Sequence, residues 1–234
     1  MNCGRSYAVA VLVLAALTPA ASHAQVRRPQ VPPSPNRQLT FRGFGDAGVT
    51  VLSATQSFKA ILGRPAGPLF GGGVELGLSK HLFVSVAASR FRRTGHRVFA
   101  FQGQVFDLNE PATITITPLE ITAGYRHTRL APPSTRAAPL AKLIPYLGGG
   151  FGFHRYTETS AHSADADDAH ATFTGYHVMG GVETPVQKWM ALAAEAQFAS
   201  VPNALGKDPN GVSSVYKEHD LGGFTFRMKV VVGR

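Results

Sequence analysis

The chain has 234 residues, 25 glycines and a formal net charge of +9, yet only 16% of its residues are charged. A disordered chain would carry more charge and fewer apolar residues, and a helical membrane protein would be far more hydrophobic than this chain, whose mean hydropathy is zero. Intermediate hydropathy with many glycines suits a β-barrel in which alternate strand residues face lipid. The length points to one domain.

The first segment, residues 1–24, has the pattern of a secretory signal peptide. Arg5 supplies a positive start, residues 8–17 form a short apolar core, and residues 22–24 (Ser-His-Ala) form a small-x-small cleavage site. The core is too short to cross a bilayer as a helix, which takes roughly 20 residues. Cys3, the single cysteine, would leave with this peptide, so we expect a mature chain without disulfides or cysteine-based metal sites.

Residues 25–38, with four prolines and three arginines, predict an extended, flexible leader. Eight segments with two-residue alternation then follow. They are longer than the five or six residues typical of soluble strands, and membrane strands need about 9–11 residues. The predicted strands are residues 39–52, 69–79, 81–92, 112–128, 143–156, 171–184, 189–201 and 216–232.

The connections between these strands differ in length. Short links follow the second and sixth strands, at Lys80 and residues 185–188, and a proline-rich link covers 129–142. The four longer connections are residues 53–68, 93–111, 157–170 and 202–215. Short turns face the periplasm in outer-membrane barrels and long loops face outside. We therefore expect residues 39–233 to form an eight-stranded antiparallel up-and-down transmembrane β-barrel in the cell outer membrane.

Two local features refine this expectation. The apolar phase changes at Pro118 within the fourth strand, which predicts a β-bulge there. Phe83 and Trp189 follow the short links, so both rings are expected in an aromatic belt at the periplasmic headgroups.

The direction in which the apolar face of each strand points distinguishes a membrane barrel from a soluble barrel. Phe224, Phe226 and Val230 share one face of the last strand, and Arg227 and Lys229 share the other. A soluble barrel turns its apolar face inward, whereas a membrane barrel turns it toward lipid. The polar faces are rich in glycine, alanine, serine and threonine, which is typical of a narrow interior. We therefore favour the membrane orientation, and a soluble periplasmic binding barrel of lipocalin type is the alternative.

On the membrane orientation, most strands carry an ionisable residue that faces the lumen. Glu195 and Arg227 lie at matching heights on neighbouring strands and should meet. A buried charge without a partner is costly, and eight strands leave an interior that side chains can fill. We therefore predict an interlinked lumen charge network made of Arg42, Asp46, Glu75, Glu120, Arg126, Glu183, Glu195, Arg227 and Lys229.

Four segments carry a resemblance to a known family: residues 41–45 (FRGFG), 71–78 (GGGVELGL), 146–152 (YLGGGFG) and 221–232 (LGGFTFRMKVVV). Through them, residues 39–232 resemble the small OmpA/OmpW-like outer-membrane β-barrel family. The resemblance implies contact with outer-membrane lipid and lipopolysaccharide and insertion by the barrel assembly machinery. Family members typically end in an aromatic residue, whereas this chain ends Val232-Gly233-Arg234.

Signals for catalysis and cofactors are weak. The glycine runs 71–73 and 148–150 complete no phosphate-binding motif. The loop segment 162–170 (HSADADDAH) gathers carboxylates and imidazoles without the spacing of a known metal site, and the adjacent His162 and Ser163 are poorly placed for a nucleophile and its base. We expect no enzymatic activity, cofactor or metal, and no nucleic-acid partner for an exported chain.

The leading hypothesis is a non-enzymatic outer-membrane barrel with a structural and surface-interaction role. The resemblance to the OmpW branch implies the alternative of a narrow passive transporter for small solutes.

Overall fold

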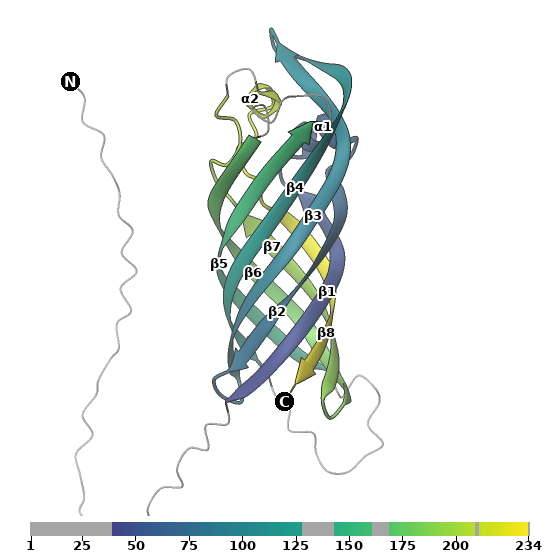
Figure 1. The fold of residues 1–234 in the computed structure, drawn as a ribbon. Helices are drawn as coiled ribbons and strands as arrows, with labels where there is room; N and C mark the ends of the chain where they lie inside the picture. Colours follow the sequence, from purple (N-terminus) through teal and green to yellow (C-terminus); the bar gives the residue numbers. More distant parts are fainter. Residues whose placement is uncertain (1–38, 128–142, 161–168, 209–210, 234) are drawn as a thin grey trace, which may run out of the picture. The chain divides into compact units, whose positions relative to one another are not determined.

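The computed structural model describes residues 39–127, 143–160, 169–208 and 211–233. The expected signal peptide, the leader, the proline-rich link and residues 162–168 lie outside them. The described strands close into a barrel in which each pairs antiparallel with its sequence neighbours and the last pairs with the first, as Figure 1 shows. This confirms the predicted fold class. The strands are β1 (Thr40–Leu52), β2 (Ala66–Gly77), β3 (Leu82–Phe101), β4 (Gln104–Arg126), β5 (Ile144–Ser160), β6 (Ala169–Gln187), β7 (Met190–Ser200) and β8 (Gly223–Gly233).

Two short helices lie in the connections, α1 (Thr55–Leu62) between β1 and β2 and α2 (Val212–Val215) between β7 and β8. Within the described ranges, no helix is both long and apolar enough to cross a membrane. The start of β1 and the end of β8 lie at one end of the barrel, here called the terminus end. The helix α1 lies at the opposite end, here called the loop end (Figure 1).

The strand faces have the membrane orientation. On β8, Phe226 is 60% exposed on the outside of the barrel, whereas Arg227 is 5% exposed and points inward. The same alternation places Glu195 of β7 inside the barrel and Phe198 outside. An apolar outer surface around a charged interior is the arrangement that a bilayer requires. A soluble lipocalin-type barrel would show the reverse.

The predicted β-bulge at Pro118 is wrong. Ala88 pairs with Leu119 and Phe91 with Ile116, so β3 and β4 keep one offset across the proline, and β5 pairs with β4 in constant register throughout. The change in the hydrophobic pattern has another cause: inward positions are polar at Glu120 but apolar at Ile116. The backbone alternation therefore continues while the chemistry of the lumen changes.

The predicted loop 93–111 is also wrong, because β3 and β4 continue beyond the barrel as a hairpin. The hairpin turns at Gln102 and Gly103, whose φ angles are 51° and 78°, and positive φ at both central residues is typical of a type I′ turn. A register shift between His96 and Val98 interrupts the alternation. That irregularity explains why the two-residue pattern alone did not reveal the extended strands.

The last strand is shorter than predicted, because β8 begins at Gly223 rather than at residue 216. Residues 212–215 form α2, and the segment that follows folds back over the barrel. Gly222 donates its backbone amide to Asp220 Oδ1 at 2.6 Å. This local turn redirects the chain before it can enter the sheet.

Candidate functional site in the barrel lumen

The first layer of lumen charges lies at the terminus end and joins four strands. Arg42 Nη2 lies 2.6 Å from Glu75 Oε1, and Arg42 Nη1 lies 2.7 Å from Glu183 Oε1. Arg126 Nη2 lies 2.8 Å from Glu75 Oε2 and 3.4 Å from Glu183 Oε2. Arg42 and Glu75 face each other on adjacent strands, whereas Glu183 comes from β6, so the layer links non-adjacent walls of the barrel. We call these four residues the terminus-end layer.

The second layer is centred on Glu195, whose side chain is 0% exposed. The strand register places Glu195 directly opposite Arg227. Its carboxylate accepts hydrogen bonds from Arg227 Nε at 2.6 Å, Lys229 Nζ at 2.6 Å and Tyr146 Oη at 2.9 Å. The two cations and the hydroxyl together satisfy a buried carboxylate that would otherwise be costly to desolvate. We call these four residues the central layer.

Hydrogen bonds extend the central layer toward the loop end. Arg227 donates to the Gln197 amide oxygen, and Gln197 Nε2 donates to Glu120 Oε1 at 2.7 Å. Beside Glu120, His177 Nδ1 lies 3.8 Å from its carboxylate, and His177 Nε2 lies 2.9 Å from Thr122 Oγ1. The amide of Gln197 therefore bridges an arginine and a second carboxylate.

Asp46 is the predicted network residue that the structure leaves without a hydrogen bond. It is 8% exposed and lies opposite Lys229 in the register of β1 and β8, but neither carboxylate oxygen has a partner among the described residues. Lys229 directs its ammonium to Glu195 and lies 4.7 Å from the centre of the Phe44 ring. Lys229 therefore binds Glu195 rather than Asp46. The alternation of the strand does not predict this choice, because it depends on the side-chain geometry.

Phe83 corrects the predicted aromatic belt. Trp189 is 52% exposed in the turn between β6 and β7, but Phe83 is 3% exposed and faces the lumen. The Phe83 ring lies 4.9 Å below the Arg126 guanidinium and packs edge-on against Tyr146. Its position in β3 puts it on the inward face, so the ring covers the terminus-end layer instead of meeting lipid headgroups.

The loop end of the lumen is apolar, which sequence reasoning missed. Buried side chains from four strands (β1 to β4), from α1 with its N-cap residue, and from the β7–β8 connection pack together there and close the bore. The sequence held one signal for it: Ile114 and Ile116 are an even number of residues from the inward Glu120, so they also point into the lumen. The members of this loop-end core are Leu52, Ala54, Phe58, Leu62, Leu69, Phe91, Ile114, Ile116, Val201, Ala204 and Leu221.

One carboxylate of the β7–β8 connection, that of Glu218, holds α1 over this core. The N-cap residue Ala54 has no side-chain acceptor, and Glu218 supplies one from the other connection: it accepts from the Gln56 amide at 2.9 Å, the Ser57 amide at 2.8 Å and Ser57 Oγ at 2.6 Å. Such capping stabilises a helix start by about 0.5–2 kcal/mol. Asp220 accepts from Ser200 Oγ at 2.5 Å and so ties the same connection to the end of β7. The two connections therefore form one lid.

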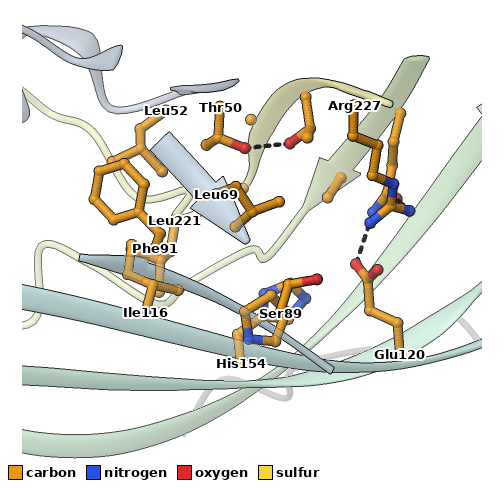
Figure 2. A pocket seen from close by; sticks show the side chains of 16 residues that line it. Thr50, Leu52, Leu69, Ser89, Phe91, Ile116, Glu120, His154, Leu221 and Arg227 are labelled. Carbon is orange, nitrogen blue, oxygen red and sulfur yellow. Dashed lines mark hydrogen bonds between the residues drawn. The ribbon is translucent and has the colours of Figure 1, made fainter. Parts of the chain in front are cut away.

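A cavity of about 50 Å³ lies between the loop-end core and the central layer. Figure 2 shows Leu52, Phe91 and Leu221 on one side of it and Arg227 and Glu120 on the other. Ser89 Oγ and His154 Nε2 lack hydrogen-bond partners among the described residues. A second cavity, beside the terminus-end layer, measures about 20 Å³. Spaces of this size hold a few water molecules at most.

In the part of the chain that the structure describes, no three His, Cys, Asp or Glu side chains are grouped so that they could hold a metal ion. Most of the segment 162–170, where carboxylates and imidazoles gather in the sequence, is outside the described residues.

Solved structures with a similar fold are small membrane barrels. Neisserial surface protein A shares 14% identity, with 83% of this chain and 97% of that chain covered and a TM-score of 0.49. The outer membrane protein OprG from Pseudomonas aeruginosa shares 11% identity over 84% and 95% of the two chains, with a TM-score of 0.49. Ail of Yersinia pestis, solved with the heparin analogue sucrose octasulfate, shares 8% identity over 83% and 97%, with a TM-score of 0.47.

No protein-family model matches the chain, and no curated protein sequence matches it. Its own geometry defines its class: the sheet is closed, the outward side chains are apolar, and the charged side chains lie inside. The protein is a small outer-membrane β-barrel.

Proposed function

We propose that this protein is a non-enzymatic membrane scaffold that holds its loop-end surface in place and contributes to envelope integrity, rather than a conduit for solutes. The observation that carries the proposal is the filling of the lumen at three heights. The terminus-end layer, the central layer and the loop-end core each join walls of the barrel through buried side chains.

Opening such a lumen would be costly. A solute would have to separate Arg42 from Glu183 and Glu195 from its cations, and breaking a buried ion pair costs about 3–5 kcal/mol. It would also have to displace Phe91, which is 1% exposed, together with α1. An eight-stranded barrel has little spare width to accommodate these movements.

The cavity also argues against catalysis. Ser89 and His154 are the polar residues there with unpartnered atoms, and a serine and a histidine can in principle form a nucleophile and its base. The cavity of about 50 Å³ under the loop-end core leaves no space for an organic substrate beside them.

The loop-end surface is where this proposal places contacts with other molecules. The β3–β4 hairpin projects past the barrel rim (Figure 1) and carries exposed apolar side chains, including Phe99, Phe101, Phe106 and Leu108. An exposed apolar surface beyond the membrane is typical of an interaction site. Within the proposal, outer-membrane lipid and lipopolysaccharide surround the barrel, and the barrel assembly machinery inserts it.

Planar-bilayer recording tests the closed lumen. We expect no reproducible single-channel steps from the wild-type protein, after insertion is verified by resistance to carbonate extraction and by a mobility difference between boiled and unboiled samples. An Arg42→Ala/Glu183→Ala variant, which removes one crossing of the bore, provides the matched comparison and should show more frequent current steps. Reproducible unitary conductance in the wild-type protein would contradict the proposal and favour the narrow passive transporter.

A further inference from the structure

Three arginines form a cluster on the outer surface of the barrel, toward the loop end. Arg90 and Arg92 belong to β3 and Arg155 belongs to β5, and all three side chains are exposed. They occupy outward positions, because they alternate with the inward Ser89, Phe91 and His154. These arginines lie outside the lumen and have no part in its charge layers.

The strand register brings the three arginines to one place. Arg92 pairs with Thr115 of β4, and Arg155 pairs with Thr117 of β4. The constant offset between β3 and β4 puts Arg90 opposite Thr117 as well. Neighbouring strands lie about 4.8 Å apart, so Arg90 and Arg155 flank Thr117 at roughly 10 Å and can reach toward one group above it. We call Arg90, Arg92, Arg155, Thr115 and Thr117 the arginine–threonine patch.

The patch carries unbalanced positive charge. No hydrogen bond or ion pair joins Arg90, Arg92 or Arg155 to an acidic side chain in the described residues. The neighbouring outward positions bring no acid: Arg90 pairs with Phe70 of β2, and Arg155 pairs with Thr172 of β6. Among the described residues, an anion of matching size would therefore meet guanidinium and hydroxyl donors without competition from a carboxylate.

The position of the patch relative to the apolar surface identifies the class of ligand. The next outward positions toward the terminus end, two residues along each strand, are Ala88, Leu119 and Phe153. Leu119 is 48% exposed and Phe153 is 47% exposed. Arginine facing lipid costs about 2–4 kcal/mol at the bilayer midplane but about 0–1 kcal/mol near the interface. Three outward arginines therefore mark the headgroup level, and a ligand seated there has its acyl chains beside Leu119 and Phe153.

We propose that the arginine–threonine patch binds the phosphate groups of a phosphorylated glycolipid in the leaflet at the loop end. The guanidinium groups of Arg90, Arg92 and Arg155 hold the phosphates, and the Thr115 and Thr117 hydroxyls donate hydrogen bonds between them. The anchored lipid, rather than a free anion, is the ligand because the apolar rows adjoin the patch. The proposal rests on membrane insertion, which it shares with the proposed function, but not on a closed lumen.

The test compares two triple variants of the full chain purified in detergent. Arg90→Gln/Arg92→Gln/Arg155→Gln removes the patch, and Lys59→Gln/Arg64→Gln/Lys188→Gln removes the same charge from exposed positions elsewhere. The probe is bisphosphorylated lipid A, titrated by thermophoresis. Near an anionic membrane surface each basic side chain contributes about fivefold to the affinity, so the patch variant, which lacks three, should lose about 100-fold. The control variant should lose less than about threefold.

Three further arms separate the sources of phosphate. Dephosphorylated lipid A should bind wild-type protein and the patch variant equally. Inorganic phosphate and the soluble polyanion dextran sulfate should each fail to displace lipid A when their anionic groups are as concentrated as the phosphates of the lipid A. Equal affinity of the wild-type protein and the patch variant for lipid A would overturn the proposal, as would equal loss in the control variant or full displacement by either soluble competitor.

Two measurements keep the outcome interpretable. Folding of each variant is verified by unboiled gel mobility, and Arg155→Gln alone replaces the triple variant if that one fails to fold, with an expected loss of about fivefold. Planar-bilayer recording of the same preparations separates the two proposals. If the protein conducts while lipid A binding still depends on the patch, only the closed scaffold is overturned. If the protein shows no conductance while the patch variant binds lipid A as well as the wild type does, only the lipid site is overturned.

Discussion

Replacing Glu195 with glutamine removes the charge at the centre of the lumen while keeping the side-chain volume. The carboxylate has 0% side-chain exposure and lies 2.6 Å from both Arg227 Nε and Lys229 Nζ. The variant therefore leaves two buried cations with an amide, which has one acceptor oxygen instead of two and brings its own N–H donors toward Lys229. Because breaking a buried pair costs about 3–5 kcal/mol, we expect a loss of about 3 kcal/mol in the free energy of unfolding.

Urea titration of the protein refolded in phosphatidylcholine vesicles measures this loss. Fluorescence of Trp189, the one tryptophan of the chain, reports folding, and mobility of unboiled samples provides an independent readout. With a denaturant slope of about 1–3 kcal/mol per molar urea, the midpoint should fall by about 1–3 M.

Glu158→Gln is the matched control, because it makes the same chemical change at the loop end. Among the described residues, Glu158 accepts one hydrogen bond, from Tyr156 Oη at 2.8 Å. Glutamine can still accept this bond, so the expected loss is below about 1 kcal/mol. Adding Lys229→Gln to Glu195→Gln removes one unpaired cation and should recover part of the stability. If Glu195→Gln unfolds at the wild-type midpoint, the central layer does not stabilise the barrel and the reasoning is refuted.

Three other predictions follow from the packing. Phe91→Ala should lower the free energy of unfolding by about 3–5 kcal/mol, because it opens a cavity in the loop-end core; an unchanged urea midpoint would contradict the packing described. Gly150→Ala should reduce the folded fraction on unboiled gels, since a Cβ there collides with the Ile121 carbonyl oxygen, whereas Gly45→Ala, with its nearest neighbour at 4.0 Å, should fold normally. Glu218→Ala should speed hydrogen exchange in α1 at least severalfold by removing its cap; exchange unchanged across residues 55–62 would argue against the lid.

The orientation of the strands was readable from the sequence because alternation is a local property. A residue's parity within a strand fixes its face, so Phe226 and Arg227 could be assigned to lipid and lumen without knowledge of the fold. The same rule placed Glu195 opposite Arg227, because antiparallel neighbours of similar length bring matching positions together.

The alternation of a strand did not reveal what surrounds the side chains on each of its faces. Phe83 is inward by the same alternation that governs β3, but its place after a short turn suggested a lipid-facing ring. Near Pro118, apolar residues occupy the same face of the strand as Glu120, and this pattern suggested a bulge. The register is in fact constant, and the lumen itself becomes apolar toward the loop end. Both errors came from treating every inward position as polar.

The sequence by itself determined the number of strands, the face of most strand residues and the presence of charges in the lumen, because these depend on residues close together in the chain. The tertiary structure decided which charges meet across the bore: Arg42 with Glu183 from β6, and Lys229 with Glu195 rather than Asp46. It also decided that α1 and the β7–β8 connection close the loop end. These contacts depend on the stagger of a closed sheet and on segments that lie far apart in sequence, and no local pattern encodes either.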